Sequence, residues 1–353
     1  MNGRNLIEEL PPRGNRRRHK QPPEAELLRQ LVSKVIGQDH ALRAIAPCVQ
    51  MYQAGLGPEG RPAGVFMLLG PTGTGKTRTV EALAEVLHGS KRHLLRIDCG
   101  EYQMDHEVAK LIGAPPGYLG HRETHPVLTQ ARLAAVTSDK SSLSLVLFDE
   151  VEKAAPSLTR LLLGVLDKAS LRLGDNNVVN FERTIIFMTS NVGASGMQRE
   201  LAPRMGFHGE AGPEAHGKLS GRMHNVAMQA ARKTFSPEFM NRLDATITYQ
   251  PLPKKTLEAI LDLQLAEFQQ HVNTRLGPRA FSVEVPPRVR RFLLEQGSSL
   301  EYGAREIRRS VHRYVAQTVA SMVVNGTARP GSVVRIELPG RDGDDAHRMP
   351  IAA

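Results

Sequence analysis

Apolar residues follow two different spacings along the chain, and together these predict an α/β fold. Short, unbroken apolar runs are typical of strands buried on both faces of a sheet, whereas apolar positions three and four residues apart are typical of helices. Val65–Leu69 is such a run, and further strands are predicted at His93–Ile97, Leu143–Phe148 and Thr184–Thr189. One predicted helix carries Val80, Leu83, Ala84 and Leu87 and ends at Gly89, and another carries Leu158, Leu161, Leu162 and Val165 and begins near Pro156. Buried strands that alternate with helices predict a doubly wound domain with a mostly parallel sheet.

The segments around these elements have a different character. Residues 24–56 are predicted to be helical with a break at 35–38, and residues 57–62 form a turn-rich linker. Residues 196–224 are rich in Gly, His, Pro and charge, which predicts a long mobile loop.

Beyond Pro251 the pattern changes and predicts a second, smaller α+β domain. Residues 254–275 and 286–325 have mainly helical spacing, and short strands are predicted at 281–285 and 332–338. The predicted organisation is a disordered basic arm (1–30), a large domain (31–250), a small domain (251–340) and a polar tail (341–353).

Composition agrees with two domains and adds a positive charge. The chain has 353 residues and a formal net charge of +10, from 46 Lys and Arg against 36 Asp and Glu. Part of the excess is local, in the cluster Arg13, Arg16, Arg17, Arg18 and Lys20. Prolines flank this cluster, which predicts either a solvated tail without a specific role or a docking arm. The charge permits binding to nucleic acid or acidic surfaces but does not require it.

The sequence contains no signal for a membrane or for secretion. No stretch approaches the ~20 apolar residues of a membrane span, and the first residues lack the apolar core of a signal peptide. The two cysteines, Cys48 and Cys99, are too few for a disulfide framework. We therefore expect a protein of the reducing cytoplasm.

A glycine-rich segment between a predicted strand and a predicted helix carries the most specific chemistry. It matches the phosphate-binding pattern GxxxxGK[ST] through Gly70, Pro71, Thr72, Gly73, Thr74, Gly75, Lys76 and Thr77. Glycines let backbone N–H groups surround phosphate oxygens, and the helix N-terminus adds favourable partial charge. Lys76 is expected to reach the terminal phosphates, and the Thr77 hydroxyl to bind Mg²⁺.

Acidic and amide side chains at two further strand ends complete a site for phosphoryl chemistry. Asp149 and Glu150 follow the strand at 143–148, where Asp149 is expected to anchor Mg²⁺ and Glu150 to activate a water molecule. Asn191 follows the strand at 184–189 and could position that water. The cofactors predicted from these residues are ATP and Mg²⁺.

With these motifs in place, the chain resembles the Clp-type AAA+ protein unfoldases, and in particular an ATPase module that ends in a Clp C-terminal domain. The resemblance runs from about Val35 to Gly340. The segments that carry it, in order, are VIGQDHALRAI (35–45), GPTGTGKT (70–77), LIGAPPGYLG (111–120), LFDEVEKA (147–154), MTSNVGAS (188–195), FSPEFMNRLD (235–244) and EYGAREIRR (301–309). It implies a P-loop AAA+ fold with a small C-terminal lid domain.

The resemblance also implies roles for individual residues. Val35 and Ile36 would line the adenine pocket, Glu150 would be the catalytic glutamate, and Asn191 the sensor of the γ-phosphate. Arg242 matches the arginine finger that enters a neighbouring subunit's site. Arg305 matches the lid arginine that contacts the nucleotide. A cation at either place would stabilise charge on a transferring phosphoryl group.

Two further segments concern substrates and partners. The mobile pore loop that grips polypeptide in the family is matched by Gly117, Tyr118, Leu119 and Gly120. The family usually continues with an acidic-Gly-Gly element, but this chain has His121-Arg122-Glu123, which would alter the grip. The tripeptide Met205-Gly206-Phe207 is similar to the peptidase-docking loop of some members, which implies a possible Clp-type peptidase partner.

The first functional hypothesis is therefore a ring-shaped ATPase, a hexamer by resemblance, that threads unfolded or tagged proteins through a central pore. A second is a nucleic-acid-stimulated motor or loader, suggested by the charge of +10. The absence of Trp and the 5% aromatic content argue against base stacking, so nucleic acid is not the expected partner. A third is a regulator that binds nucleotide as a switch without hydrolysing it, against which Asp149, Glu150, Arg242 and Arg305 argue.

Overall fold

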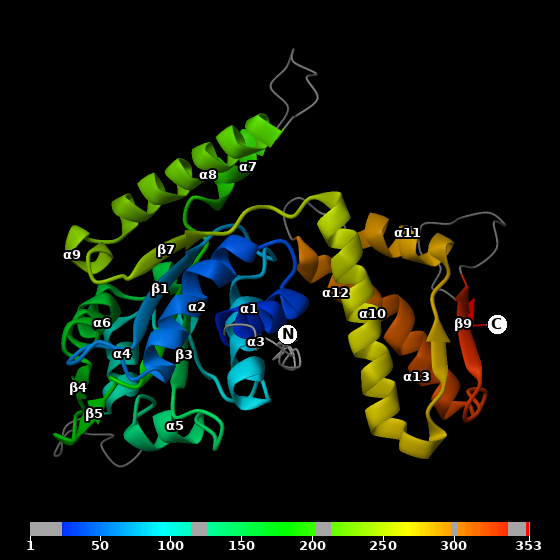
Figure 1. Ribbon diagram of the computed structural model, residues 1–353, viewed down its shortest axis with the longest axis horizontal. Helices are drawn as coiled ribbons and strands as arrows, with labels where there is room; N and C mark the ends of the chain where they lie inside the picture. Colours follow the sequence, from blue (N-terminus) through cyan, green and yellow to red (C-terminus); the bar gives the residue numbers. More distant parts are fainter. Residues whose placement is uncertain (1–22, 114–125, 202–212, 298–302, 338–350, 353) are drawn as a thin grey trace, which may run out of the picture.

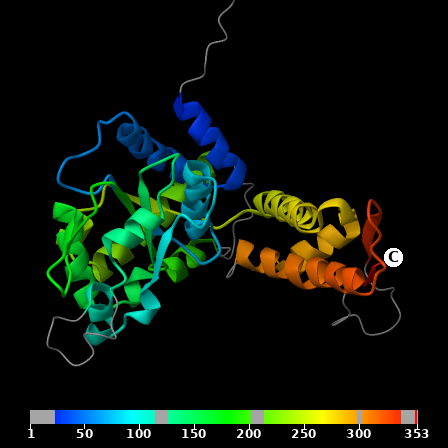
Figure 2. The same ribbon diagram turned by 90° about the horizontal axis from the view of Figure 1, so that it is seen from below.

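The chain forms two domains that lie side by side. The computed structural model describes residues 23–113, 126–201, 213–297, 303–337 and 351–352. A large domain ends at β7 (Ala245–Thr248), and a small domain begins at α10 (Lys254–Leu276), as Figure 1 shows. The two remain distinct bodies in the perpendicular view of Figure 2. Within the described residues no helix is both long enough and apolar enough to cross a membrane.

A five-stranded parallel sheet forms the centre of the large domain. Its strands are β1 (Gly64–Leu69), β2 (Leu95–Asp98), β3 (Ser144–Asp149), β6 (Thr184–Ser190) and β7, in the spatial order β2-β3-β6-β1-β7. The four strands predicted from apolar runs are confirmed. The fifth, β7, was not predicted, because its short sequence Ala-Thr-Ile-Thr has no unbroken apolar run and lies at the sheet edge. A small hairpin, β4 (Ser170–Arg172) with β5 (Val178–Asn180), stands apart from this sheet.

Helices cover both faces of the sheet, which explains why its central strands β1, β3 and β6 are buried along their whole length. In β1, Phe66 and Leu68 pack into one buried cluster, whereas Val65 and Met67 pack into another on the opposite face. The first cluster is closed by α1 (Pro23–Lys34), α2 (Asp39–Gln53) and α3 (Lys76–His88). The second is closed by α4 (Asp105–Ile112), α5 (Gln130–Ala135), α6 (Pro156–Lys168), α7 (Ala194–Leu201), α8 (Pro213–Thr234) and α9 (Pro237–Met240). The predicted doubly wound α/β architecture is therefore confirmed.

The prediction of a long loop over residues 196–224 is wrong in the part that the structure describes. α7 and α8 pack side by side there (Figure 1), and α8 buries Met223, Ala227 and Ala231 at four-residue intervals. Glycines in α8 misled the prediction, since each costs a helix about 1 kcal/mol relative to alanine. Burial of the apolar stripe offsets that cost, and Gly196 admits close contact, since a Cβ there would lie 2.7 Å from Val226 Cγ1.

The small domain packs its helices against a short sheet, as predicted for an α+β unit. Its further elements are α11 (Pro287–Gly297), α12 (Ala304–Val311), α13 (Gln317–Val324), β8 (Ser282–Glu284), β9 (Val333–Glu337) and β10 (Ile351–Ala352). A π-helical turn at His312–Ala316 joins α12 to α13. Single turns of 3-10 helix occur at Cys99–Glu101, Val151–Lys153 and Gly277–Arg279.

Both ends of the chain differ in part from their predicted character. Residues 23–30 of the predicted basic arm belong to α1, and the basic cluster itself lies outside the described residues. Within the predicted polar tail, Ile351–Ala352 pairs antiparallel with β9 as β10. A single Ile between a proline and two alanines is too short a run to predict such a strand.

Candidate active site

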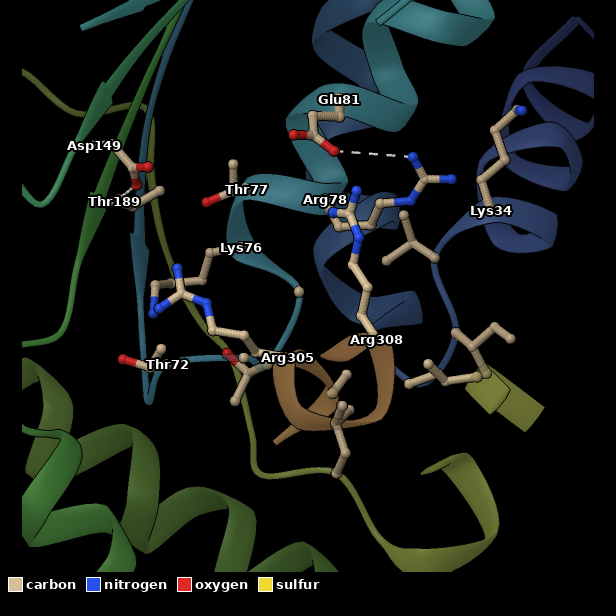
Figure 3. Close-up of a pocket in the computed structure, with 18 of the residues that line it drawn as sticks. Lys34, Thr72, Lys76, Thr77, Arg78, Glu81, Asp149, Thr189, Arg305 and Arg308 are labelled. Atoms are coloured by element: carbon tan, nitrogen blue, oxygen red, sulfur yellow. Dashed lines mark hydrogen bonds and ion pairs between the residues drawn. The ribbon is translucent and has the colours of Figure 1, made fainter. Parts of the chain in front are cut away.

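A pocket of about 300 Å³ lies where the two domains meet. Figure 3 shows side chains that converge on it from the glycine-rich loop, α3, the strand ends and α12. Its cationic residues are Lys34, Lys76, Arg78, Arg96, Arg305 and Arg308, against the acidic residues Glu81, Asp149 and Glu150. The excess of positive charge suits a polyanionic ligand.

The glycine-rich loop has a backbone that requires glycine. It joins the end of β1 to α3, and Gly70 and Gly75 have φ values of 145° and 104°. A Cβ on Gly70 would lie 2.5 Å from the Tyr249 carbonyl oxygen. The loop therefore places backbone N–H groups at the N-terminus of α3, which is an anion-binding arrangement. The structure thus brings the predicted residues from Thr72 to Thr77 to the pocket, whereas Gly70 and Pro71 do not line it and instead accept hydrogen bonds from Lys76.

Gln38 forms hydrogen bonds that anchor the glycine-rich loop. This residue was not identified from the sequence. Its buried side-chain amide donates to the carbonyl oxygens of Thr74 at 3.0 Å and Gln250 at 2.9 Å. The residue therefore ties the start of α2 to the loop and to the chain leaving β7. Its position in the VIGQ segment, close to Val35 and Ile36, could have indicated that it lies near the pocket.

Lys76 is buried in the loop with its ammonium on oxygen acceptors. Nζ donates to the carbonyl oxygens of Gly70 at 2.5 Å and Pro71 at 2.9 Å, and to Asn191 Oδ1 at 2.9 Å. Burial lowers its pKa to about 8, against the opposing effect of Glu152 and the other nearby carboxylates. A polyanion in the loop would stabilise the charged form of this lysine.

The end of β3 presents Asp149 and Glu150 toward the loop. The Asp149 carboxylate accepts hydrogen bonds from the Thr189 hydroxyl and the Arg96 guanidinium. Glu150 has a φ of 56°, an uncommon left-handed conformation for a residue with a side chain. Its backbone N–H donates to Thr189 Oγ1 at 2.9 Å, which helps to hold that conformation. Strain of this kind is common where a side chain must be aimed at a reaction centre.

Asn191 connects the lysine to the glutamate. Its Oδ1 accepts from Lys76, and its Nδ2 donates to Glu150 Oε1 at 3.1 Å. Lys153 forms an ion pair with the other oxygen of Glu150. The structure therefore places the predicted phosphate-binding lysine, the predicted base and the predicted sensor in one hydrogen-bonded row.

Thr77 and Asp149 fit the predicted magnesium site. Mg²⁺ prefers oxygen ligands and usually takes only one or two from protein, the rest coming from phosphates and water. The Thr77 hydroxyl forms no hydrogen bond with any residue that the structure describes, so it is free to act as a ligand. Among the same residues there is no group of three or more His, Cys, Asp or Glu that could hold a metal unaided.

The opposite end of the pocket is apolar. Val35 and Ile36 line it, together with Leu252, which precedes α10, and Ile260 and Leu263 of α10. An aromatic base fits such a surface. The sequence did not single out the small-domain residues, because on an amphipathic helix they are indistinguishable from core positions.

α12 brings two arginines to the pocket. Arg305, predicted as a nucleotide contact, and Arg308, one turn later, both line it and appear in Figure 3. The Ala304 N–H at the start of α12 donates to the Gly73 carbonyl oxygen at 3.0 Å. Arg308, Arg96 and Thr189 were missed from the sequence. Arg308 could have been found from its i, i+3 spacing to Arg305. Arg96 and Thr189 could have been found from their positions in the strands on either side of β3, which ends at Asp149.

Arg242 lies outside this pocket. Its guanidinium pairs with Asp167 on α6 at 3.0 Å, and both side chains are about two-fifths exposed. The structure does not bring Arg242 to its own chain's phosphate loop, as expected for a residue that acts on a neighbour. The pore-loop residues 117–120 and the tripeptide 205–207 lie outside the described residues.

Comparisons with known proteins agree with this geometry. The family model described as "AAA domain (Cdc48 subfamily)" matches residues 61–246, and "C-terminal, D2-small domain, of ClpB protein" matches residues 252–336. The "Chaperone protein ClpB" of Corynebacterium diphtheriae is 35% identical over 87% of this chain and 32% of its own length. The "Negative regulator of genetic competence ClpC/MecB" of Bacillus subtilis is 35% identical over 89% and 36%. The chain thus spans about a third of the length of these curated relatives.

Solved structures of a related protein have the same fold. The chain is 26% identical to Hsp104 of S. cerevisiae in an Hsp104:casein complex, with a TM-score of 0.73 over 89% of this chain and 50% of that one. A closed-state structure of Hsp104 with ATPγS and FITC casein gives 25% identity and a TM-score of 0.72 over 90% and 50%. The fold described above is therefore an AAA+ module with its C-terminal small domain.

Proposed function

This chain belongs to the Clp-type AAA+ ATPase family, and from that premise we propose that it hydrolyses ATP and uses the free energy to unfold or disaggregate other proteins. The observation that carries the proposal is the row Lys76–Asn191–Glu150 beside Thr77 and Asp149. In this row and beside it, a phosphate-binding lysine, two ligands for a metal ion and a general base lie in one pocket. The apolar end of the pocket would take the adenine.

Each residue has a definable task in this reaction. The loop amides and Lys76 bind the phosphates, while Thr77 and Asp149 would hold Mg²⁺, which supplies charge neutralisation on the phosphates when bound. Glu150 accepts a proton from the attacking water, whose oxygen bonds to the terminal phosphorus as the bond to the ADP oxygen breaks. Asn191 orients that water, and Arg305 stabilises charge on the phosphates from the small domain.

We further propose a ring of copies, a hexamer, in which Arg242 acts on the neighbouring site. The exposure of Arg242 and its distance from its own pocket support this role. The ion pair with Asp167 is at the surface and costs little to exchange for a phosphate, since exposed pairs contribute about 0–1 kcal/mol.

The proposed substrates are unfolded polypeptides, gripped by Tyr118. Support comes from relatives named as chaperones and from Hsp104 structures that contain casein. A Clp-type peptidase partner has no support besides the tripeptide Met205-Gly206-Phe207. Cys48 and Cys99 are free, which suits the proposed cytoplasmic location.

Three measurements on the purified chain test the proposal: ATP turnover, mass with and without ATP, and unfolding of a tagged fluorescent reporter. We expect turnover, a nucleotide-dependent ring and loss of reporter fluorescence. Tyr118→Ala should keep basal turnover and lose unfolding. A Tyr118→Ala protein that unfolds the reporter at the wild-type rate would contradict threading. Turnover stimulated by DNA, with steep salt dependence, would instead favour a nucleic-acid motor.

A further inference from the structure

Arg78, immediately after the phosphate-binding Lys76 and Thr77, joins the two domains. Its Nη1 pairs with Glu85 of its own helix at 2.8 Å, and its Nη2 pairs with Glu267 of α10 at 3.0 Å. Figure 3 shows the guanidinium at the edge of the pocket, near Glu81. The Arg78 side chain of the large domain thus binds one carboxylate on its own domain and one on the small domain.

This ion pair belongs to a longer row of charged and polar groups. Glu85 also pairs with Lys34 at 2.8 Å, directly before Val35 at the apolar end of the pocket. On the other side, Glu267 accepts from the Gln264 amide at 3.1 Å, and Gln264 lines the pocket. The row therefore connects the end of α1, the residues of α3 from Arg78 to Glu85 and the middle of α10.

The arrangement favours a lasting contact over a transient surface pair. Arg78 and Glu85 are only about a quarter and a fifth exposed, so the arginine is held firmly on α3, whereas Glu267 is more than two-fifths exposed. Partial burial raises the pKa of Glu85, but the hydrogen bonds from Lys34 and Arg78 outweigh this and hold it below its ordinary value. Glu85 is therefore charged at neutral pH. The planar fork of arginine can bind two carboxylates at once, which the single ammonium of lysine does less well.

Movement of α10 would carry the rest of the small domain with it. Leu261 of α10 and Ile307 of α12 lie in the same buried cluster, so the two helices move together. α12 in turn places Arg305 in the pocket and donates the Ala304 N–H to Gly73. Whatever holds α10 against α3 therefore also holds the small domain over the phosphate loop.

We propose that Arg78 is a positioning residue for the nucleotide, because its ion pair with Glu267 keeps the small domain closed over the pocket and slows nucleotide release. This inference rests on the proposed function for the identity of the ligand. It adds a residue on which the catalytic chemistry itself does not depend.

The closed state can be measured without nucleotide by hydrogen exchange at Ala304. As the first residue of α12, its N–H has no partner within the helix and is protected by the Gly73 carbonyl of the other domain. Arg78→Gln and Glu267→Gln should each speed this exchange by about three- to tenfold, and the double variant no more than Arg78→Gln alone. Arg309→Gln removes an ion pair inside the small domain, to Glu306 at 2.6 Å, and should change nothing.

Release of fluorescent ADP provides the second measurement. Arg78→Gln and Glu267→Gln should each release it about three- to tenfold faster and raise KM, and Glu267→Gln, whose side chain does not line the pocket, should leave kcat undiminished. Release should accelerate with salt more steeply in the wild type than in Arg78→Gln, which keeps the other cations of the pocket but lacks the ion pair between the domains.

The proposal is overturned if exchange at Ala304 is unchanged in Arg78→Gln, if Arg309→Gln has the same effect, or if the two single effects add. Faster exchange with unchanged ADP release would also overturn it, since the domains would then close without retaining nucleotide. A wild-type chain that binds no nucleotide would contradict the proposed function instead, and the exchange at Ala304 would still report whether Arg78 closes the domains.

Discussion

The two sides of the pocket are built in different ways. On the large-domain side, Lys76, Asp149 and Asn191 are engaged in hydrogen bonds at the end of a buried sheet. On the small-domain side, the side chains of Arg305 and Arg308 form neither a hydrogen bond nor an ion pair with any residue in the described part of the chain. The first side is preorganised, so its groups need little rearrangement to bind phosphate. The small-domain side carries its charges on a separate domain, so their contribution to nucleotide binding depends on the position of that domain.

This difference indicates a division of labour. Groups that must be correctly placed for the chemical step are anchored to the sheet. Groups whose contact should change as ATP becomes ADP are carried by a domain that can move. Changes on the sheet side should therefore affect turnover most, and changes on the small-domain side should affect binding and release.

Glu150→Gln should produce the largest effect, because the amide keeps the shape of the side chain and cannot accept the proton. We expect kcat for ATP hydrolysis to fall by about 10²- to 10⁴-fold, with ATP binding retained. Turnover and fluorescent-nucleotide binding measure the two effects. Glu152→Gln is a nearby control, although its Oε1 accepts the Asn191 N–H at 3.0 Å, so a small loss is expected there. Equal losses in both variants would contradict the assignment of Glu150 as the base.

Arg305→Ala should produce the next largest effect. Removing a cation from the phosphates is expected to lower kcat/KM by about 10- to 100-fold, with much of the change in KM. Arg308→Ala is the matched comparison, because it lies one turn further along α12, and its effect should be smaller. Steady-state kinetics of both variants would test this. A loss confined to kcat would place Arg305 with the preorganised side and break the comparison.

The pKa of Lys76 predicts a pH dependence of binding. Burial lowers this pKa to about 8 in the free protein, and bound phosphates would raise it again. Binding should therefore take up a proton above pH 8, and affinity should fall by up to about tenfold per pH unit there. Below pH 8 Lys76 is already charged, so no such loss is expected. Calorimetry in buffers of different ionisation enthalpy measures the uptake, which Lys76→Met should abolish along with binding.

The same lowered pKa has a consequence for stability, with the sign set by proton binding. Between pH 8 and its ordinary value of 10.5, Lys76 binds a proton in the unfolded chain more readily than in the folded one. The free energy of unfolding of the nucleotide-free protein therefore gains from this lysine as pH rises through that window. Thermal unfolding of wild type and Lys76→Met should converge toward high pH, and a constant difference would contradict the shift.

Gly303→Ala should produce the smallest change. Gly303 has a φ of 52°, and a Cβ there would lie 2.8 Å from the Gly73 carbonyl oxygen. We expect roughly threefold weaker nucleotide binding, with about 1 kcal/mol less stability from backbone strain. Gly326, also in the small domain, has a φ of 70° with no atom within 4 Å of its added Cβ. Gly326→Ala should therefore cost stability without weakening binding, and equal effects on binding would show that the contact with Gly73 is unimportant.

The sequence by itself determined the core of the large domain and the chemistry at its sheet edge. Both depend on residues close together in the sequence: an apolar run such as Leu145–Phe148 forms a strand where both faces are covered, and Asp149 then stands at the end of that strand. The loop from Gly70 to Thr77 is likewise specified by neighbours along the chain, because its glycines dictate its turns.

Only the tertiary structure decided which distant residues complete the pocket. Leu263, Arg308 and Glu267 lie far along the chain from the phosphate loop, and nothing local distinguishes them from ordinary residues of amphipathic helices. α8 is helical despite its glycines, because burial of Met223 and Ala227 in the core stabilises it by more than the low helix propensity of glycine destabilises it. Local preference is a matter of tenths of a kcal/mol to about 1 kcal/mol per residue, whereas burial of one large apolar side chain contributes about 1.5–3 kcal/mol, so packing decides where the two conflict.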